Sequence, residues 1–148
     1  NDLLLDGKKC CGILTEMAAD PDALEYVVVG AGLNVHQRVF PPELADRATS
    51  LCLAGEDAPL RGLLQAALEE LEKTMDTLET QGFAALLPAY CQKSDTLGKR
   101  VKLLPVGGGE PYFATALAIE SSGALRVQRD DGETISVQSA EVSLRGGE

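Results

Sequence analysis

The sequence predicts an α+β protein in which a mixed sheet with packed helices is followed by a small β-domain. Three observations support this prediction. Strand-like apolar runs occupy residues 1–35, leucine recurs at helical spacing over residues 60–78, and short strand-like units separated by glycine-containing turns occupy residues 97–148. With 148 residues and 45% hydrophobic side chains, the chain is long enough to bury a hydrophobic core.

A hairpin is predicted at the start of the chain. Its strands are Leu3–Leu5 and Lys8–Glu16, joined by Asp6-Gly7. This dipeptide readily adopts the positive φ angles that a tight two-residue turn needs. Strict alternation along the second strand would place Lys9 and Gly12 on opposite faces.

The run Val27–Val35 has the composition and length of a strand buried on both faces. Gly30 and Gly32 share one face, where the missing Cβ atoms leave a flat space for a ligand. Asn34 falls on the same face and offers an amide donor and acceptor. A close helix-on-sheet contact explains the glycines equally well. The run is not a dinucleotide-binding fingerprint, because it lacks a third glycine and a following helix.

Three helices are predicted in the middle of the chain. Residues 41–48 form a short one, since two prolines suit its first turn. The clearest is Leu60–Leu78, where leucines face one side and acidic residues the other, and Gly82 ends it. We expect this helix to cover the core; docking into a partner's groove is the alternative. The third, Phe83–Gln92, should be interrupted or bent near Pro88.

The last third of the chain changes its periodicity and its charge. Five short antiparallel strands separated by turns predict a small closed barrel. The formal charge is −9 over residues 1–96 and −1 over residues 97–148. We therefore expect two domains, 1–96 and 97–148. The strand-like units are centred on Val101–Val106, Phe113–Ile119, Leu125–Val127, Ile135–Val137 and Val142–Leu144.

Composition excludes several classes of function. A net charge of −10 argues against sequence-independent binding to nucleic acid or to anionic membranes. No apolar stretch approaches the roughly 18 residues of a spanning helix, so a cytoplasmic protein is expected. The four cysteines lack Cys-x-x-Cys spacing and His36 is the single histidine, which argues against zinc. Adjacent Cys10 and Cys11 are expected on opposite strand faces, as reduced thiols.

Four motifs in fixed order give the sequence a resemblance to a known family. They are Asn1-Asp2, Lys9-x-x-Gly12-Ile13-Leu14, Gly30-Ala31-Gly32-Leu33-Asn34 and Val142-Ser143-Leu144-Arg145. Together they resemble the C-terminal half of biotin protein ligase (biotin–acetyl-CoA-carboxylase ligase), in which part of a catalytic domain precedes an SH3-like domain. The resemblance covers essentially the whole chain.

The resemblance implies a ligase that works in two steps. Biotin and ATP first give biotinyl-5′-AMP, and a lysine of a carboxylase carrier domain then takes up the biotinyl group. The implied ligands are ATP, Mg²⁺ and biotin, and the implied partner is a biotin carboxyl carrier protein or domain. A homodimer is one possible assembly.

Lys9 and Asp2 are the catalytic residues that the resemblance implies. Lys9 matches the family lysine that contacts the carboxyl end of biotin and the phosphate, where an ammonium would stabilise developing negative charge. Asp2 matches the motif aspartate that helps to orient ATP and the incoming amine. Without the resemblance, both residues are most simply solvated charges at the surface.

Seven further residues receive roles from the resemblance or from their surroundings. Gly12, Gly30 and Gly32 would let the flat rings of biotin lie against backbone, and Leu14 would add an apolar wall. Asn34 would lie near the phosphates and the magnesium, with a turn-capping amide as the alternative. Arg145 matches an arginine that reaches toward the nucleotide, although a surface salt bridge explains it equally well. His36 is interpreted as structural.

The chain departs from the family pattern at its start. Only Asn1-Asp2 remain of the family's Lys-Trp-Pro-Asn-Asp motif, and the glycine- and arginine-rich adenylate loop has no counterpart in the sequence. We therefore expect the isolated chain to be a truncated fragment with little or no catalytic activity. A different class of function, an interaction module built on the C-terminal barrel, is the alternative.

Overall fold

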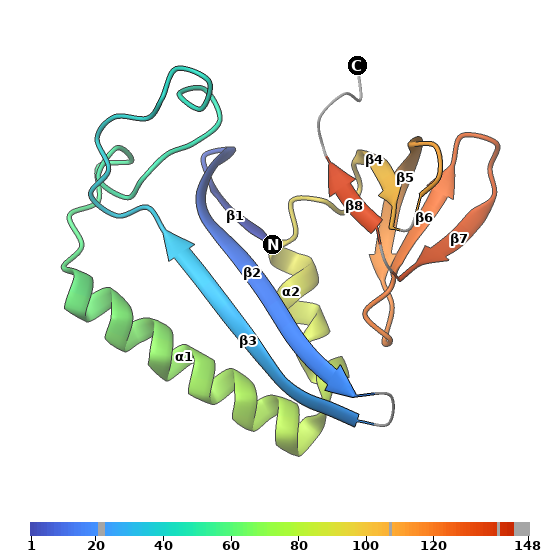
Figure 1. Ribbon diagram of the computed structural model, residues 1–148, viewed down its shortest axis with the longest axis horizontal. Coiled ribbons are helices and arrows are strands. Elements are labelled where there is room, and N and C mark those ends of the chain that lie inside the picture. Colours follow the sequence, from blue (N-terminus) through green and yellow to red (C-terminus); the bar gives the residue numbers. More distant parts are fainter. Residues whose placement is uncertain (21–22, 107, 139, 144–148) are drawn as a thin grey trace. The chain divides into compact units, whose positions relative to one another are not determined.

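The computed structural model describes residues 1–20, 23–106, 108–138 and 140–143 (Figure 1). Its backbone forms two compact units, residues 1–69 and 70–148. Two sheets and the helices between them confirm the predicted α+β class. The domain boundary expected near Leu97 stays a prediction; the strands of the second sheet all lie beyond it.

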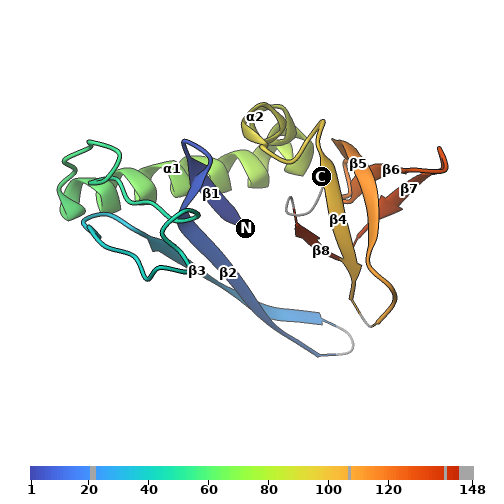
Figure 2. The same cartoon turned by 90° about the horizontal axis from the view of Figure 1, so that it is seen from above.

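The first unit contains a three-stranded antiparallel sheet in the order β1-β2-β3. Its strands are β1 (Asp2–Leu5), β2 (Lys8–Asp20) and β3 (Ala23–Leu33). The predicted hairpin is confirmed, with positive φ angles of 51° at Asp6 and 74° at Gly7. Figures 1 and 2 show β2 and β3 running together as a long two-stranded ribbon.

A β-bulge interrupts the pairing of β1 with β2. Leu3 pairs with Cys11 and Leu4 pairs with Lys9, so Cys10 is an extra residue on β2. An extra residue reverses the alternation of side chains between faces. The side chain of Lys9 accordingly lies over Gly12, and the prediction that these two residues occupy opposite faces is wrong.

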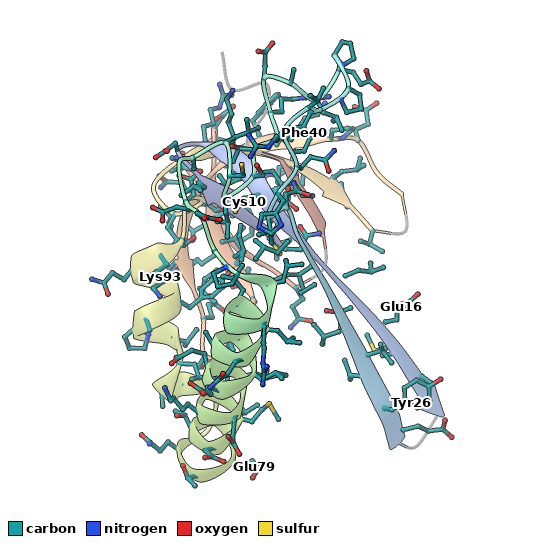
Figure 3. All side chains as sticks on the ribbon, turned by 90° about the vertical axis from the view of Figure 1, so that its left-hand side faces the viewer. Cys10, Glu16, Tyr26, Phe40, Glu79 and Lys93 are labelled. Carbon is teal, nitrogen blue, oxygen red and sulfur yellow. The ribbon has the colours of Figure 1, made fainter. Side chains whose placement is uncertain are left out.

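The central part of β3 is not buried. Val27, Val28 and Val29 are 48%, 51% and 63% exposed, so the prediction of a strand buried on both faces is wrong for the described chain. Neighbouring residues point to opposite faces, and exposure of all three means that neither face is covered here. Figure 3 shows Tyr26 and Glu16 on this open part of the ribbon.

The segment between β3 and the long helix consists of turns. Backbone bonds from Leu44 to Pro41 (2.8 Å) and from Arg47 to Leu44 (2.9 Å) close successive turns, and the predicted helix over residues 41–48 is absent from the described structure. Ala48 instead forms a parallel β-bridge with Lys9. A helix cannot continue through Ala48, because the flanking backbone groups bond to β2.

The predicted long helix is confirmed as α1 (Leu60–Gln81), and Gly82 follows it with φ 78°. None of its residues is buried, so the prediction that it covers a core is wrong for the described chain. Leu64 and Leu68, on its apolar side, are 61% and 56% exposed, so the described residues leave this side largely open. No helix among the described residues is long and apolar enough to cross a membrane.

The second unit continues with a 3₁₀ helix, η1 (Phe83–Ala85), and with α2 (Leu87–Lys93). The predicted third helix is thus broken at Leu86, and Pro88 lies in the first turn of α2. Proline is accommodated in a first turn because its missing N–H has no intrahelical partner there.

A five-stranded antiparallel sheet in the order β7-β6-β5-β4-β8 completes this unit. The five predicted strands are confirmed. No ladder between β7 and β8 is found among the described residues, so the closed SH3-like barrel remains a prediction. The strands are β4 (Arg100–Pro105), β5 (Tyr112–Ile119), β6 (Leu125–Arg129), β7 (Thr134–Val137) and β8 (Ala140–Ser143). Its buried core consists of Val101, Leu103, Ala114, Ala116, Leu125 and Val127.

Leu103→Ala should destabilise this sheet by about 2–5 kcal/mol, because the side chain is 0% exposed and its removal leaves a cavity. Leu104→Ala is the matched control on the same strand, since Leu104 is 41% exposed. Urea unfolding followed by circular dichroism measures both. Equal losses in the two variants would contradict the assigned core.

Candidate active site

The predicted catalytic residues Lys9 and Asp2 lie in contact. The Lys9 Nζ is 2.6 Å from the Asp2 Oδ1, and the two side chains are 42% and 40% exposed. An ion pair this exposed contributes little to stability, typically ~0–1 kcal/mol. Its position leaves the ammonium open to an anionic ligand while a carboxylate holds it in place.

Three glycines extend from this ion pair across the sheet. Gly12 pairs with Gly32 in the β2–β3 ladder, and Leu14 pairs with Gly30. Paired residues of an antiparallel ladder share a face, as do residues two apart on one strand. The structure therefore brings together on one face, here called the glycine face, the residues Lys9, Gly12, Leu14, Gly30 and Gly32.

The glycines of the glycine face are not equivalent. A Cβ atom added at Gly30 or Gly32 would lie 3.9 Å from the nearest backbone oxygen, which is an ordinary contact. A Cβ added at Gly12 would lie 3.2 Å from both Cε and Nζ of Lys9. The open space is thus at Gly30 and Gly32, beside the 65% exposed side chain of Leu14.

Asn34 follows the end of β3 and forms hydrogen bonds that join β3 to β2 and to the segment 49–51. Its backbone N–H donates to Cys10 (2.8 Å), its carbonyl accepts from Leu51 (3.0 Å), and its Nδ2 donates to the carbonyl of Thr49 (3.1 Å). The side-chain amide therefore has a structural role, but it joins the end of β3 to Thr49 and does not cap a turn, as the alternative expected. A nucleotide contact through the remaining Oδ1 stays a prediction.

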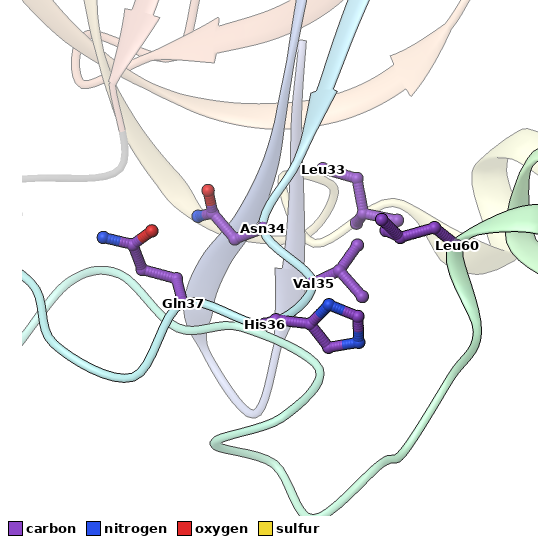
Figure 4. A pocket seen from close by; sticks show the side chains of 6 residues that line it. All are labelled: Leu33, Asn34, Val35, His36, Gln37 and Leu60. Atoms are coloured by element: carbon purple, nitrogen blue, oxygen red, sulfur yellow. The ribbon is translucent and has the colours of Figure 1, made fainter.

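A shallow depression of about 420 Å³ adjoins Asn34. Its lining residues are Leu33, Asn34, Val35, His36, Gln37 and Leu60. Figure 4 shows the apolar side chains of Leu33, Val35 and Leu60 gathered on one side, with the amides of Asn34 and Gln37 pointing the other way. His36 is exposed at this depression, and a purely structural role for it stays a prediction.

Sequence reasoning missed the segment 47–53, which supports the site through hydrogen bonds to its backbone. Lys9 donates its N–H to the carbonyl of Arg47 (2.8 Å) and accepts from the N–H of Thr49 (2.9 Å). Ser50 is 0% exposed; its hydroxyl donates to Gln37 (2.6 Å) and accepts from the N–H of Leu53 (3.1 Å). Only a run of small and polar residues marks this segment in the sequence.

The predicted contacts of Arg145 with the nucleotide and of Asn34 with Mg²⁺ stay predictions. Arg145 lies outside the described residues, so its nucleotide contact stays a prediction. Among residues that the structure describes, no group of three or more His, Cys, Asp or Glu side chains is placed to hold a metal ion. Asn34 offers one neutral oxygen, whereas Mg²⁺ in proteins usually takes one or two carboxylates. The charge stabilisation that the site offers therefore comes from its own side chains.

Cys10 and Cys11 are both buried, at 6% and 4% exposure (Figure 3 labels Cys10). Burial, with a smaller contribution from the neighbouring Cys11, raises the pKa of the Cys10 thiol. A buried thiol that stays protonated is a poor nucleophile.

Iodoacetamide at pH 8 should therefore alkylate the partly exposed Cys52 and Cys91 well before Cys10. Mass spectrometry of the digested protein gives the order of modification. The control is the same reaction in denaturant, where the difference should vanish. Early labelling of Cys10 in the folded protein would contradict its placement.

Ser50→Ala should lower the free energy of unfolding by about 1–3 kcal/mol, because it removes two hydrogen bonds, to Gln37 and from Leu53, each worth about 0.5–1.5 kcal/mol. Ser122→Ala is the control, since Ser122 makes its backbone contact to Ala124 from an exposed position. Chemical denaturation compares the two, and an equal, small effect would argue against the role of Ser50.

Comparison with known proteins identifies relatives of this chain. Residues 96–145 match the family of the biotin protein ligase C terminal domain. The bifunctional ligase/repressor BirA of Bacillus subtilis is 35% identical over 147 residues, covering 97% of this chain and 44% of BirA. BirA of Escherichia coli is 28% identical over 149 residues, covering 100% of this chain and 46% of that protein.

Solved structures show the same likeness. The apo structure of biotin protein ligase from Aquifex aeolicus superimposes with a TM-score of 0.80 at 27% identity, covering 97% of this chain and 61% of that one. The same ligase in complex with biotin and ATP gives a TM-score of 0.77 at 27% identity, with 97% and 58% covered.

The relatives named above are ligases by name, and this chain is homologous to them. The resemblance to biotin protein ligases that its motifs predict is thereby confirmed. The chain spans a little under half the length of the BirA proteins that it matches.

Proposed function

We propose that this chain forms part of a biotin protein ligase that joins biotin to a lysine of a biotin carboxyl carrier protein or domain. The observation that carries the proposal is the exposed ammonium of Lys9, held 2.6 Å from Asp2 at one end of the glycine face. Homology to a ligase whose structure contains biotin and ATP supports it.

The first step makes biotinyl-5′-AMP. A carboxylate oxygen of biotin attacks the α-phosphorus of ATP, a new P–O bond forms, and the bond to the β-phosphate oxygen breaks to release pyrophosphate. Negative charge builds up on the oxygens between the two substrates. The Lys9 ammonium stabilises that charge, and Asp2 keeps the ammonium in position because the two side chains are paired.

The second step moves the biotinyl group to the carrier. The neutral amine of a carrier lysine attacks the acyl carbon, an amide bond forms, and the bond to AMP breaks with loss of the amine proton. Lys9 again stabilises charge on the oxygens of the leaving phosphate. Asp2 orients the incoming amine, for which its carboxylate is 40% exposed.

Biotin lies against the open part of the glycine face. The fused rings rest on the backbone at Gly30 and Gly32, where an added Cβ would intrude on the ligand rather than on the protein. Leu14, 65% exposed, supplies an apolar contact. Asn34 and Arg145 contact the nucleotide in this proposal.

We also propose that the chain is inactive, or nearly so, by itself. Both faces of the sheet at Val27–Val29 are open to solvent, and a ligand on the glycine face would keep its outer side in water. Exclusion of water strengthens the electrostatic stabilisation on which the first step depends. The remaining part of a full-length ligase would supply that cover.

Lys9→Ala in the full-length protein should lower the rate of biotinyl-adenylate formation about 100-fold or more, because it removes the charge that stabilises the transition state. Release of pyrophosphate in the presence of biotin and ATP measures the rate. Lys8→Ala is the matched control, since Lys8 makes a 3.4 Å contact to Ala45 and has no part in the proposed step.

An unchanged rate in the Lys9→Ala protein would remove Lys9 from the site. Failure of the unmodified full-length protein to label a biotin-acceptor domain would instead reject the ligase function itself.

A further inference from the structure

Gly12 is the most tightly confined of the described glycines, and the group that confines it is a side chain. Its added Cβ would lie 3.2 Å from Cε and Nζ of Lys9, a distance tighter than ordinary van der Waals contact. The corresponding nearest distances are 3.9 Å at Gly30 and Gly32 and 3.6 Å at Gly62. The space above Gly12 is therefore filled by the proposed catalytic lysine.

The backbone at Gly12 does not itself require glycine. Gly12 is not among the described residues with positive φ, and it sits in regular register between Asp2 and Gly32. Glycine in a strand interior is less favourable than alanine by roughly 0.5–1 kcal/mol. What glycine provides here is room, at some cost to strand stability.

The β-bulge is what brings Lys9 over that room. If Cys10 were regularly paired instead of bulged, the three-residue spacing from Lys9 to Gly12 would carry the lysine to the opposite face. Backbone hydrogen bonds hold the bulge in place. The Cys10 carbonyl accepts one from the N–H of Asn34 (2.8 Å), and the backbone of Lys9 forms two, with Arg47 and Thr49. Since the backbone of Lys9 is fixed, the direction of its side chain depends on what lies beneath it.

We propose that Gly12 is a positioning residue that acts through Lys9. By leaving out a Cβ atom, it lets the lysine stem lie across the strand and bring its ammonium against Asp2, which pairs with Gly12 in the neighbouring strand. The inference rests on the proposed function, and it assigns to Gly12 a task other than direct contact with biotin.

Gly12→Ala would force the end of the Lys9 side chain to move by a few tenths of an ångström. The stem has four rotatable carbons and is 42% exposed, so it can turn into solvent without disturbing the sheet. We expect unchanged or slightly higher stability and about 10-fold slower adenylate formation, since a misplacement of about 1 Å costs about 100-fold and this displacement is smaller.

A double-mutant cycle in the full-length protein tests the inference. Adenylate formation is measured in the unmodified protein, Gly12→Ala, Lys9→Ala and the double variant. If Gly12 acts through Lys9, its substitution lowers the rate in the unmodified background and changes it less than about twofold when Lys9 is already alanine. Gly62→Ala, in α1 and away from Lys9, is the control and should leave the rate unchanged.

Each other result counts against the inference. Equal losses in the two backgrounds would show that Gly12 acts independently, for example by touching biotin. A Gly12→Ala protein that fails to fold, judged by its urea unfolding curve, would place the role of Gly12 in the fold. Failure of the proposed function is separate, because the unmodified full-length protein would then form no biotinyl-adenylate and would label no biotin-acceptor domain.

Discussion

The antiparallel pairing of β2 with its two neighbours is the constraint on which the candidate site depends. β1 brings Asp2 to Gly12, and β3 brings Gly32 to the other side of the same residue. Three segments distant in sequence thus meet at one point, and the bulge at Cys10 turns Lys9 toward it. A ladder of backbone bonds fixes such a meeting to within a fraction of an ångström, as loops rarely do.

The segment 47–53 adds a second fixation, beside β2. It bonds to the backbone at Lys9 and to both the backbone and the side chain of Asn34. A proposed catalytic residue and a proposed nucleotide contact therefore share one support. This buried support explains why two side chains that are themselves partly exposed can still have defined positions.

Much of the fold could be predicted because its signals are local. Asp6-Gly7 specifies its turn, the leucine spacing specifies α1, and Pro88 marks the start of α2. Three features could not. The bulge at Cys10 depends on register between strands, and residues 41–48 form turns because their neighbours bond to Lys9. The exposure of Val27–Val29 was missed because hydrophobicity shows that a strand favours burial, but not what covers it.

The candidate site, like the fold, was predictable where its signals are local and not where it depends on the register between strands. Family motifs brought Lys9, Asp2 and the glycines to attention, yet only the register shows that Gly12 and Gly32 are neighbours and that Lys9 lies above the former. The extra residue in β2 has a consequence at the level of the gene. Loss of the single codon for Cys10 would alter no other residue and would leave Lys9 two residues from Gly12, so that regular alternation alone would keep both on one face.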